Sequence, residues 1–281
     1  KKRKIRNGLG GFKIQKITMR DILKTVKEYS GQVAYPTIGL SMLAGLSYLG
    51  VLFSFAMGYL SPIITTLFLS FLTFTAYTPM HEAVHGNIGG NRKLNWLDKV
   101  IGYLMAPIVA IPFTSHQKEH FAHHKHTNGE GDPDVHIKNL FDSPKDFLKA
   151  TIAVIKTQNA YVWNTFTKAE IGVSLGWRLL FIYFTGLISI PVLLFGWFGG
   201  AFLTIFLLSY LPHQPYENTK RWENTNIKLF SMQWIENLMY KHNLHAIHHL
   251  YPRVPFYNYR KVFEKIEPTL REKGTPFKEH K

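Results

Sequence analysis

Histidines are the residues of this chain whose number and spacing could do chemistry. Of the 14 histidines, 11 fall in three short windows, residues 81–85, 116–126 and 242–249. The first window holds a His-x-x-x-His pair, which lies on one face of a helix, and each of the others holds His-x-x-His-His. A lone histidine on an apolar helix is usually a packed core residue, but three clusters are not explained in that way. Such clusters predict a transition-metal site.

The number of clustered histidines bears on the kind of metal site. His-Glu-Ala-Val-His at 81–85 also fits the zinc peptidase pattern His-Glu-x-x-His, in which two histidines bind one zinc ion and the glutamate acts as a base. A tetrahedral zinc site would use few of the eight clustered histidines of suitable spacing, and His213 adds a ninth candidate. Two metal ions with open positions fit the number better. Imidazole binds iron, zinc, copper and nickel, so the ligand type by itself does not select one metal.

Long apolar blocks must position these windows. Residues 31–80 contain no Asp, Glu, Lys, Arg or His, and residues 171–212 contain only Arg178. Each block can hold two membrane spans of about 20 residues, with breaks expected at 58–62 and 196–200, where Gly or Pro cluster. A buried hairpin in a soluble protein is the alternative, but 50 uncharged residues leave no polar face for water. The predicted spans are residues 34–57, 61–80, 172–195 and 198–213, all approximate.

The remaining segments form a predicted cap on one side of the membrane. The run at about 97–115 contains Pro107 and Pro112 and is too short for a span, so we expect an interfacial or re-entrant segment. Four spans return the chain to its starting side, which groups both termini with cap residues 81–168 and 214–281. Because these segments are rich in Lys and Arg, the positive-inside rule makes that side cytoplasmic. We therefore expect one all-α domain over residues 1–281, an integral membrane four-span helical bundle with a cytosolic histidine-rich cap.

Composition excludes several classes of function. With 33 Lys and Arg against 18 Asp and Glu, the formal net charge is +15, which anionic lipid headgroups and acidic protein partners explain better than nucleic acid does. The absence of cysteine excludes a thiolate zinc site, an iron–sulfur cluster and a cysteine nucleophile. The sequence has no dinucleotide-binding or haem motif, so a redox reaction would need electrons from an external donor.

The histidine windows, placed around two apolar hairpins, resemble the membrane fatty-acid desaturase and hydroxylase superfamily. The resemblance covers roughly residues 30–270 and implies a four-span bundle capped by a cytosolic di-iron site. Four stretches are more specifically similar to the cyanobacterial-type β-carotene hydroxylases, and carotenoid ketolases share part of the pattern. These stretches are residues 124–134, 210–216, 221–224 and 245–259.

The resemblance implies a set of metal ligands and neighbouring residues. The ligands would be His81, His85, His120, His123, His124, His213, His245, His248 and His249. In the acyl desaturases an Asn one turn before the isolated histidine contacts metal through water, whereas this chain has Ser209 four residues before His213. Because a ligating imidazole usually donates its other N–H to a carboxylate or carbonyl, acidic neighbours are candidate supporting residues. The candidates around the ligands are Glu82, Asp132, Asp134, His116, His126 and His242.

The implied reaction is the O₂-dependent oxidation of an unactivated C–H bond in a membrane lipid by two non-haem iron ions. Such a bond has no acidic proton, so general acid–base chemistry does not break it. The stretches above favour hydroxylation of a carotenoid (β-carotene) ring, with a fatty-acyl lipid desaturase and a carotenoid ketolase as alternatives. A membrane metal-binding or transport protein is the non-enzyme alternative, which the near absence of ionisable residues in the spans disfavours.

Two surfaces are expected from the same interpretation. A basic cap face would attract an acidic electron donor such as ferredoxin, through Lys261, Lys265, Arg271 and Lys273. A substrate passage from the membrane would be lined by apolar and aromatic residues next to the ligand windows. Its candidate residues are Tyr210, Leu211, Phe113 and Pro112.

Overall fold

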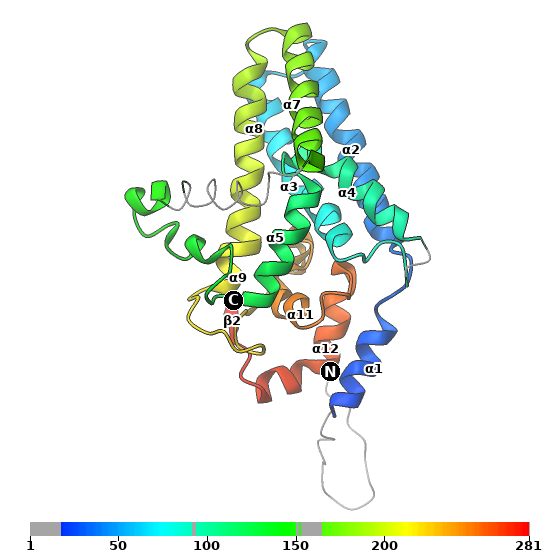
Figure 1. The fold of residues 1–281 in the computed structure, drawn as a ribbon, viewed down its shortest axis with the longest axis vertical. Coiled ribbons are helices and arrows are strands. Elements are labelled where there is room, and N and C mark those ends of the chain that lie inside the picture. Colours follow the sequence, from blue (N-terminus) through cyan, green and yellow to red (C-terminus); the bar gives the residue numbers. More distant parts are fainter. Residues whose placement is uncertain (1–17, 92–93, 150–151, 153–164, 281) are drawn as a thin grey trace, which may run out of the picture.

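The long helices and the histidine-rich cap occupy opposite ends of the molecule (Figure 1). The computed structural model describes residues 18–91, 94–149, 152 and 165–280. Nearly all regular structure in these residues is helical, and the one pair of strands among them forms a small parallel sheet, β1 (Ile227–Phe230) with β2 (Phe277–His280). The predicted all-α class is therefore confirmed.

The first hairpin begins and ends close to its predicted limits. α2 (Tyr35–Ala56) has a proline in its first turn, and α3 (Pro62–Val84) begins at Pro62 with Ser61 as its N-cap. Gly58 turns the chain between them with a φ of 77°, which glycine adopts without steric cost. α3 continues past the predicted end at residue 80 as far as Val84, and therefore carries His81 to the cap.

The second hairpin turns at a different place from the one predicted. α7 (Thr165–Thr185) and α8 (Ser189–Thr204) are joined at Gly186, whose φ is 84°. The predicted break at 196–200 is wrong, because these residues lie inside α8 and their glycines pack against α3. A Cβ on Gly196, Gly199 or Gly200 would lie no more than 2.8 Å from an atom of Leu69, Ser70 or Thr73. Small residues at such positions let two helices approach closely.

Three helical stretches among the described residues are long and apolar enough to cross a membrane, namely α2, α3 and Ser189–His213. The last combines α8 with a π-helical turn, η2 (Ile205–Tyr210), and a final turn, α9 (Leu211–His213). α4 (Asn95–Val109) and α5 (Phe113–His126) would make a fourth span only as a pair, which is bent by 96°. α7, which replaces the predicted span 172–195, is not among the three and contains Lys168, Glu170 and Arg178.

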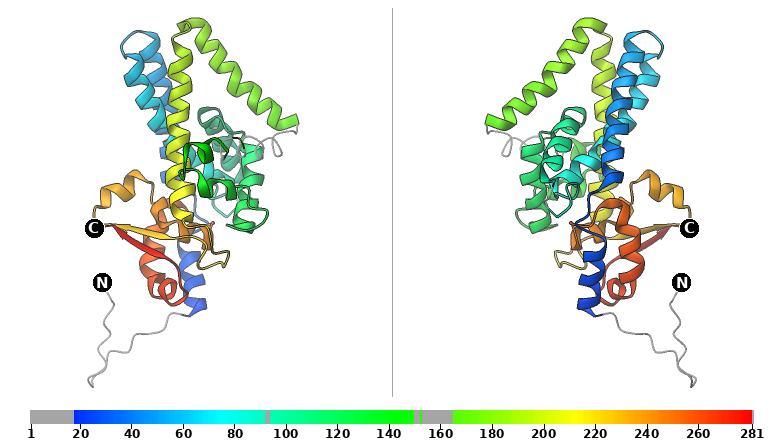
Figure 2. Two further views of the ribbon diagram at one scale, coloured as in Figure 1. Left: turned by 90° about the vertical axis from the view of Figure 1, so that its left-hand side faces the viewer. Right: turned by 90° about the vertical axis from the view of Figure 1, so that its right-hand side faces the viewer.

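α3 is the central helix of the bundle. It packs against α2, α4 and α8, and its last thirteen residues, from Leu72 to Val84, are all buried. α7 leans away from α8 below their shared turn, on the side opposite the α2–α3 hairpin (Figure 2). The segment predicted as interfacial forms α4, an elbow at Ala110 with a φ of 58°, and the start of α5.

The cap joins the two ends of the described chain. α1 (Met19–Glu28) packs on α12 (Tyr259–Glu272) through Ile22, which lies in one hydrophobic cluster with Val262 and Ile266. The other cap elements are η1 (Val135–Asn139), α10 (Gln233–Leu238), η3 (His242–Leu244), α11 (His245–Leu250) and η4 (Phe256–Asn258). Residues 92–93, 150–151 and 153–164 of the predicted cap lie outside the described residues.

Candidate metal centre

The nine predicted ligands come from four segments that end where the bundle meets the cap. The end of α3 carries His81 and His85, and α5 carries His120, His123 and His124. His213 ends the Ser189–His213 stretch, and α11 carries His245, His248 and His249. All nine side chains are buried or half-buried. The structure therefore brings together histidines that are far apart in the sequence.

A first histidine group consists of His81, His85, His120 and His248. One ring nitrogen from each lies within 4.8 Å of the corresponding nitrogens of the other three. His120 occupies the middle, with its Nε2 atom 3.0 Å from Nε2 of His81 and 2.9 Å from Nε2 of His85. Ring nitrogens from α3, α5 and α11 thus meet at one point.

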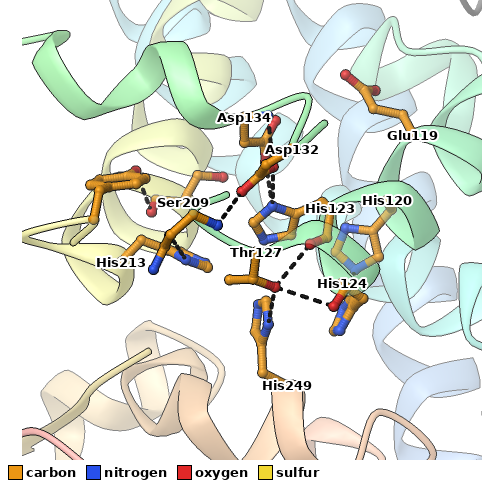
Figure 3. A network of polar contacts seen from close by, with 12 residues as sticks. Glu119, His120, His123, His124, Thr127, Asp132, Asp134, Ser209, His213 and His249 are labelled. Atoms are coloured by element: carbon orange, nitrogen blue, oxygen red, sulfur yellow. Dashed lines mark hydrogen bonds and ion pairs between the residues drawn. The ribbon is translucent and has the colours of Figure 1, made fainter. Parts of the chain in front are cut away.

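A second histidine group consists of His123, His213 and His249, whose ring nitrogens also lie within 4.8 Å of one another (Figure 3). His124 lies between the two groups: its Nε2 is 3.0 Å from Nε2 of His120 and 2.9 Å from Nε2 of His248, and its ring stacks on His249. His245, the ninth histidine, joins the second group, because its Nε2 is 3.1 Å from Nε2 of His249.

The arrangement fits bound cations rather than a network of hydrogen bonds. A neutral imidazole has one N–H and one lone pair. Nε2 of His120 faces three other Nε2 atoms, at 2.9–3.0 Å, and donates to at most one of them. Nε2 of His213 is buried and has no hydrogen-bond partner among the described residues. A metal ion in each group would bind these lone pairs, so the residues fit the two metals that the sequence implied.

The electrostatics keep most of the rings in the form that binds metal; the exception is His123, whose pKa burial would lower but the neighbouring Asp134 and Asp132 raise. Burial lowers the pKa of His245, His248 and His249 well below the usual range, because the charged form is desolvated, and neighbouring histidines lower it further. Neutral imidazoles are the species that ligate metal, so no proton has to be removed from these rings at neutral pH.

Four polar side chains hold the Nδ1 atoms of predicted ligand rings and leave Nε2 for the centre of each group. Asp132 Oδ1 lies 2.8 Å from Nδ1 of His123, and Asn128 Oδ1 lies 3.2 Å from Nδ1 of His213. The Thr127 hydroxyl is 3.3 Å from Nδ1 of His249, and the Tyr259 hydroxyl is 3.0 Å from Nδ1 of His248. The amide group of Asn128 donates to two backbone carbonyls, so its oxygen accepts the N–H of His213. Sequence reasoning predicted only Asp132 of these four.

The loop after α5 is built around Asp132. Its carboxylate accepts the backbone N–H groups of Asn128 and Asp134 as well as the ring of His123. Burial by itself would raise the pKa of Asp132, but the hydrogen bond and charge of His123 hold it below the usual range. Asp134 Oδ2 is 3.6 Å from Nδ1 of His123, and burial raises the pKa of Asp134 to about 6. Asp132, which is closer to the ring and has the lower pKa, is therefore the main carboxylate partner of His123.

The other predicted supporting residues have different environments. Glu82 is fully buried and accepts a hydrogen bond from Asn87, away from the ligand rings. His116 packs beside His120, and His242 lies beside His81, with its Nε2 3.5 Å from the Thr78 hydroxyl. The last two predicted supporting residues, His126 and Ser209, make no hydrogen bond to a predicted ligand ring among the described residues. His126 packs on Gly131, and the backbone carbonyl of Ser209 accepts a hydrogen bond from the Tyr216 hydroxyl.

A cavity of about 120 Å³ adjoins the histidines on the side of the bundle. It touches both groups, and its apolar wall comes from α3, the α4–α5 elbow, η1 and the π-helical turn. The apolar residues of that wall are Tyr77, Ile111, Ile137, Ile205 and Leu208. Of the residues predicted for a substrate passage, Pro112 lines the next cavity and Phe113 packs against Gly102, while Tyr210 packs on Phe141. The backbone carbonyl of Leu211, the fourth residue predicted for the passage, accepts a hydrogen bond from the side chain of Asn226.

The predicted basic face is partly neutralised. Lys265 pairs with Glu28 at 2.9 Å, and Arg271 pairs with Glu267 at 2.9 Å. Lys261 lies over the ring of Tyr29, and Lys273 is exposed. The positive charge left for a partner on this face is therefore centred on Lys261 and Lys273.

Comparison with known proteins decides the family. The family model for fatty acid desaturases matches residues 57–281. The chain belongs to the fatty acid desaturase family. An sn-1 oleoyl-lipid 12-desaturase of Picosynechococcus sp. is 25% identical over 91% of this chain and 84% of its own length. A protein of the same name from Anabaena variabilis is 25% identical over 95% of this chain and 86% of its own.

Chloroplast members of the family match less of their length. The sn-2 acyl-lipid omega-3 desaturase (ferredoxin) of Helianthus annuus is 25% identical over 68% of this chain and 52% of its own length, so the chain spans about half of that relative. Family membership and the buried histidine groups make the protein a multi-pass membrane oxidoreductase of the di-iron type. The more specific resemblance to carotene hydroxylases is not shown by these relatives, and a non-catalytic transport protein is no longer a competing interpretation.

Proposed function

We propose that the protein is an acyl-lipid desaturase, which removes two hydrogens from a hydrocarbon chain of a membrane lipid with O₂ as co-substrate. The observation that carries the proposal is the convergence of nine histidines, in two groups, beside a cavity on the side of the apolar bundle. Two iron ions bound there would supply the oxidising power, drawn from O₂, that an unactivated C–H bond requires. The acyl-lipid desaturases among its relatives support this substrate class.

The residues of the chain orient the ligands and exclude water. Asp132, Asn128 and Thr127 fix three ligand rings of the second group, so their Nε2 atoms point to the centre. Tyr77 and Leu208 present buried apolar surface to the cavity beside the histidines. A methylene group held against that surface would be oriented toward the ligand atoms and shielded from water.

The electrons come from a separate donor in this proposal. The sequence has no cysteine, and a relative whose name specifies ferredoxin supports an acidic iron–sulfur donor. Such a donor would dock on the basic cap around Lys261 and Lys273. We further propose that both termini and the metal centre are cytoplasmic, in accordance with the positive-inside rule, and that residues 1–281 form one domain.

Hydroxylation of a carotenoid ring is the second candidate, with ketone formation as its close variant. It is favoured by the stretches 210–216 and 245–259, which resemble the carotene hydroxylases. Both candidates use the same ligands, because alcohol and alkene differ in the fate of the carbon after the first hydrogen is removed.

Product analysis distinguishes these functions. The chain would be produced in a bacterium that makes β-carotene and has saturated and monounsaturated lipids, together with a ferredoxin and its reductase. Fatty-acid methyl esters and pigments from the same culture would then be separated by chromatography. New double bonds in lipid acyl chains with unchanged carotene support the proposal. Hydroxylated or ketonic carotene with unchanged lipids would transfer the assignment to the second candidate, and His120→Ala serves as the inactive control.

A further inference from the structure

We propose that a cavity between the end of α3, α4, α5 and Arg253 binds the anionic headgroup of a glycerophospholipid, and that the acyl chain of this lipid runs along α4 to the histidines. This inference rests on the proposed acyl-lipid function and names its substrate as an intact membrane phospholipid. It is drawn from three cavities that share lining residues around the α4–α5 elbow.

The headgroup cavity has a volume of about 460 Å³ and mixed polar and cationic walls. Lys99 and Arg253 supply its positive charge, and Asn95 and Gln117 add amide groups. Its one carboxylate, on Asp98, accepts the backbone N–H groups of Ile88 and Gly89 at 2.8 and 3.2 Å. This carboxylate forms no ion pair with Lys99 or Arg253 among the described residues, so the N–H donors of both cations can bind an external anion.

Arg253 is held in place by the backbone near the first histidine group. Its Nη1 atom donates to the carbonyl of His85, and a Cβ on Gly86 would lie 2.8 Å from the same atom. Gly86 has a φ of 65°, so glycine suits both the backbone and the close approach. A guanidinium group has five N–H donors, and the remaining ones are available to a phosphate.

The side of α4 next to this cavity has the character of a membrane boundary. Trp96, Val100 and Leu104 recur every four residues on one side of the helix and are 55%, 42% and 62% exposed. Lys99 lies between them and is exposed, with no ion-pair partner among the described residues. Tryptophan and lysine of this kind are enriched where hydrocarbon meets headgroups, so the cavity lies at the depth of lipid phosphates.

An apolar cavity continues from the headgroup cavity toward the metal centre. It has a volume of about 420 Å³ and is lined by Ala106, Pro107 and Pro112, with Val173 and Leu175 on its α7 side. Two charged residues also border it, but Glu170 accepts the backbone N–H of Thr114 and Arg178 donates to Ser174. The hydrocarbon part of a lipid therefore fits this cavity, while its headgroup does not.

Two residues connect the three cavities. Tyr103 lines both the headgroup and the apolar cavity, and Ile111 lines both the apolar cavity and the one beside the histidines. The helical distance from Lys99 to Ala110 is about 16 Å at 1.5 Å per residue. One leaflet of a bilayer has a hydrocarbon depth of about 15 Å. A lipid with its phosphate at Lys99 would thus bring the distal part of its acyl chain to the elbow.

The test measures which lipid the full-length protein retains. Native mass spectrometry would be applied to protein released from nanodiscs that contain equal amounts of phosphatidylglycerol and phosphatidylcholine. We expect bound phosphatidylglycerol to exceed phosphatidylcholine, and Lys99→Gln to lower that ratio by about fivefold. Lys118→Gln, an exposed lysine of α5 that does not line the cavity, is the matched control. Equal binding of both lipids by the parent, or the same decrease in Lys118→Gln, would overturn the headgroup site.

A second variant tests the path. Ile111→Trp fills the junction of two cavities, so lipid turnover should fall at least tenfold while the ratio of bound lipids stays that of the parent. Unchanged turnover would refute the path along α4. The lipid ratio is measured without turnover, so a chain that forms no double bonds in any lipid would refute the proposed function while the headgroup site is still tested.

Discussion

The two histidine groups of the metal centre are supported in different ways. In the second group three of the four rings, His123, His213 and His249, have an Nδ1 partner, from Asp132, Asn128 and Thr127. Nδ1 of the fourth ring, His245, is buried and has no hydrogen-bond partner in the part of the chain that the structure describes. In the first group, among the described residues, only His248 has an Nδ1 contact with a non-histidine side chain, the Tyr259 hydroxyl. Nδ1 of His81 is buried with no hydrogen-bond partner there.

The difference shows two routes to a fixed ligand. Three rings of the second group are oriented by hydrogen bonds, including one to an anionic carboxylate, which raises ligand basicity. In the first group His81 and His85 are oriented by packing, because α3 is buried along the whole stretch that ends at these two residues. Changes to polar neighbours should therefore weaken the second group more, and loss of the shared middle ligand should disable both.

The largest expected effect is the loss of His120. Its Nε2 atom meets three other ligand nitrogens, including that of His124, which connects the groups. His120→Ala should reduce bound iron to less than one ion per chain and lower lipid oxidation below detection, while the protein still inserts in the membrane. Iron analysis of the purified protein measures this. His126→Ala, outside the cluster, should retain both iron and activity; full activity of His120→Ala would contradict the ligand set.

Asp132→Asn should weaken the second group selectively. The amide keeps the shape of the side chain but loses the charge that holds His123, which should lower iron affinity by about 10- to 100-fold. A chelator titration should then remove one iron well before the other, instead of both together. Asp142→Asn is the control, since that side chain is exposed. If both irons were lost in parallel, the groups would not be independent.

Tyr259→Phe removes the polar support of the first group with little change in packing. Because two rings of that group are held by the packing of α3, iron affinity should fall by about tenfold or less. The same chelator titration measures this loss of affinity, and the iron that is removed first should now be the one held by the first group. An effect larger than that of Asp132→Asn would reverse the proposed difference between the groups.

Charge reversal on the cap should affect neither histidine group, and we expect it to change activity least of the four substitutions. Replacing Lys261 and Lys273 by Glu should slow donor-supported turnover by a few fold, because attraction at the surface is screened within about 8 Å at physiological salt. Turnover driven by a chemical reductant should be unchanged, as should iron content. A donor-supported rate that ignores both salt and charge reversal would place the docking face elsewhere.

The spacing of histidines predicted which residues meet, but not what holds them. Metal ligands on a helix must be histidines or similar residues spaced by three or four positions, so the sequence by itself indicated the three windows. Tyr259 supports His248 from a separate helix, and nothing local to either residue marks that contact. Asn128 and Thr127 immediately follow the second window, and that position is the only signal that pointed to them.

Glycine and helix geometry explain the other differences. Glycine permits both a turn and a close helix contact, so the cluster at 196–200 predicted a break where the structure has packing against α3. Counting four residues back from His213 to Ser209 assumed an α-helix. The structure has a π-helical turn over Ile205–Tyr210, which includes Ser209, before the α-helical turn that carries His213.

Mössbauer spectroscopy of protein loaded with ⁵⁷Fe tests the central claim most directly. Two unlike histidine groups that each hold one iron predict two quadrupole doublets of equal area, with two iron ions per chain, and Asp132→Asn should change only one of the doublets. A single doublet, one iron per chain, or one zinc ion in place of iron would contradict the account.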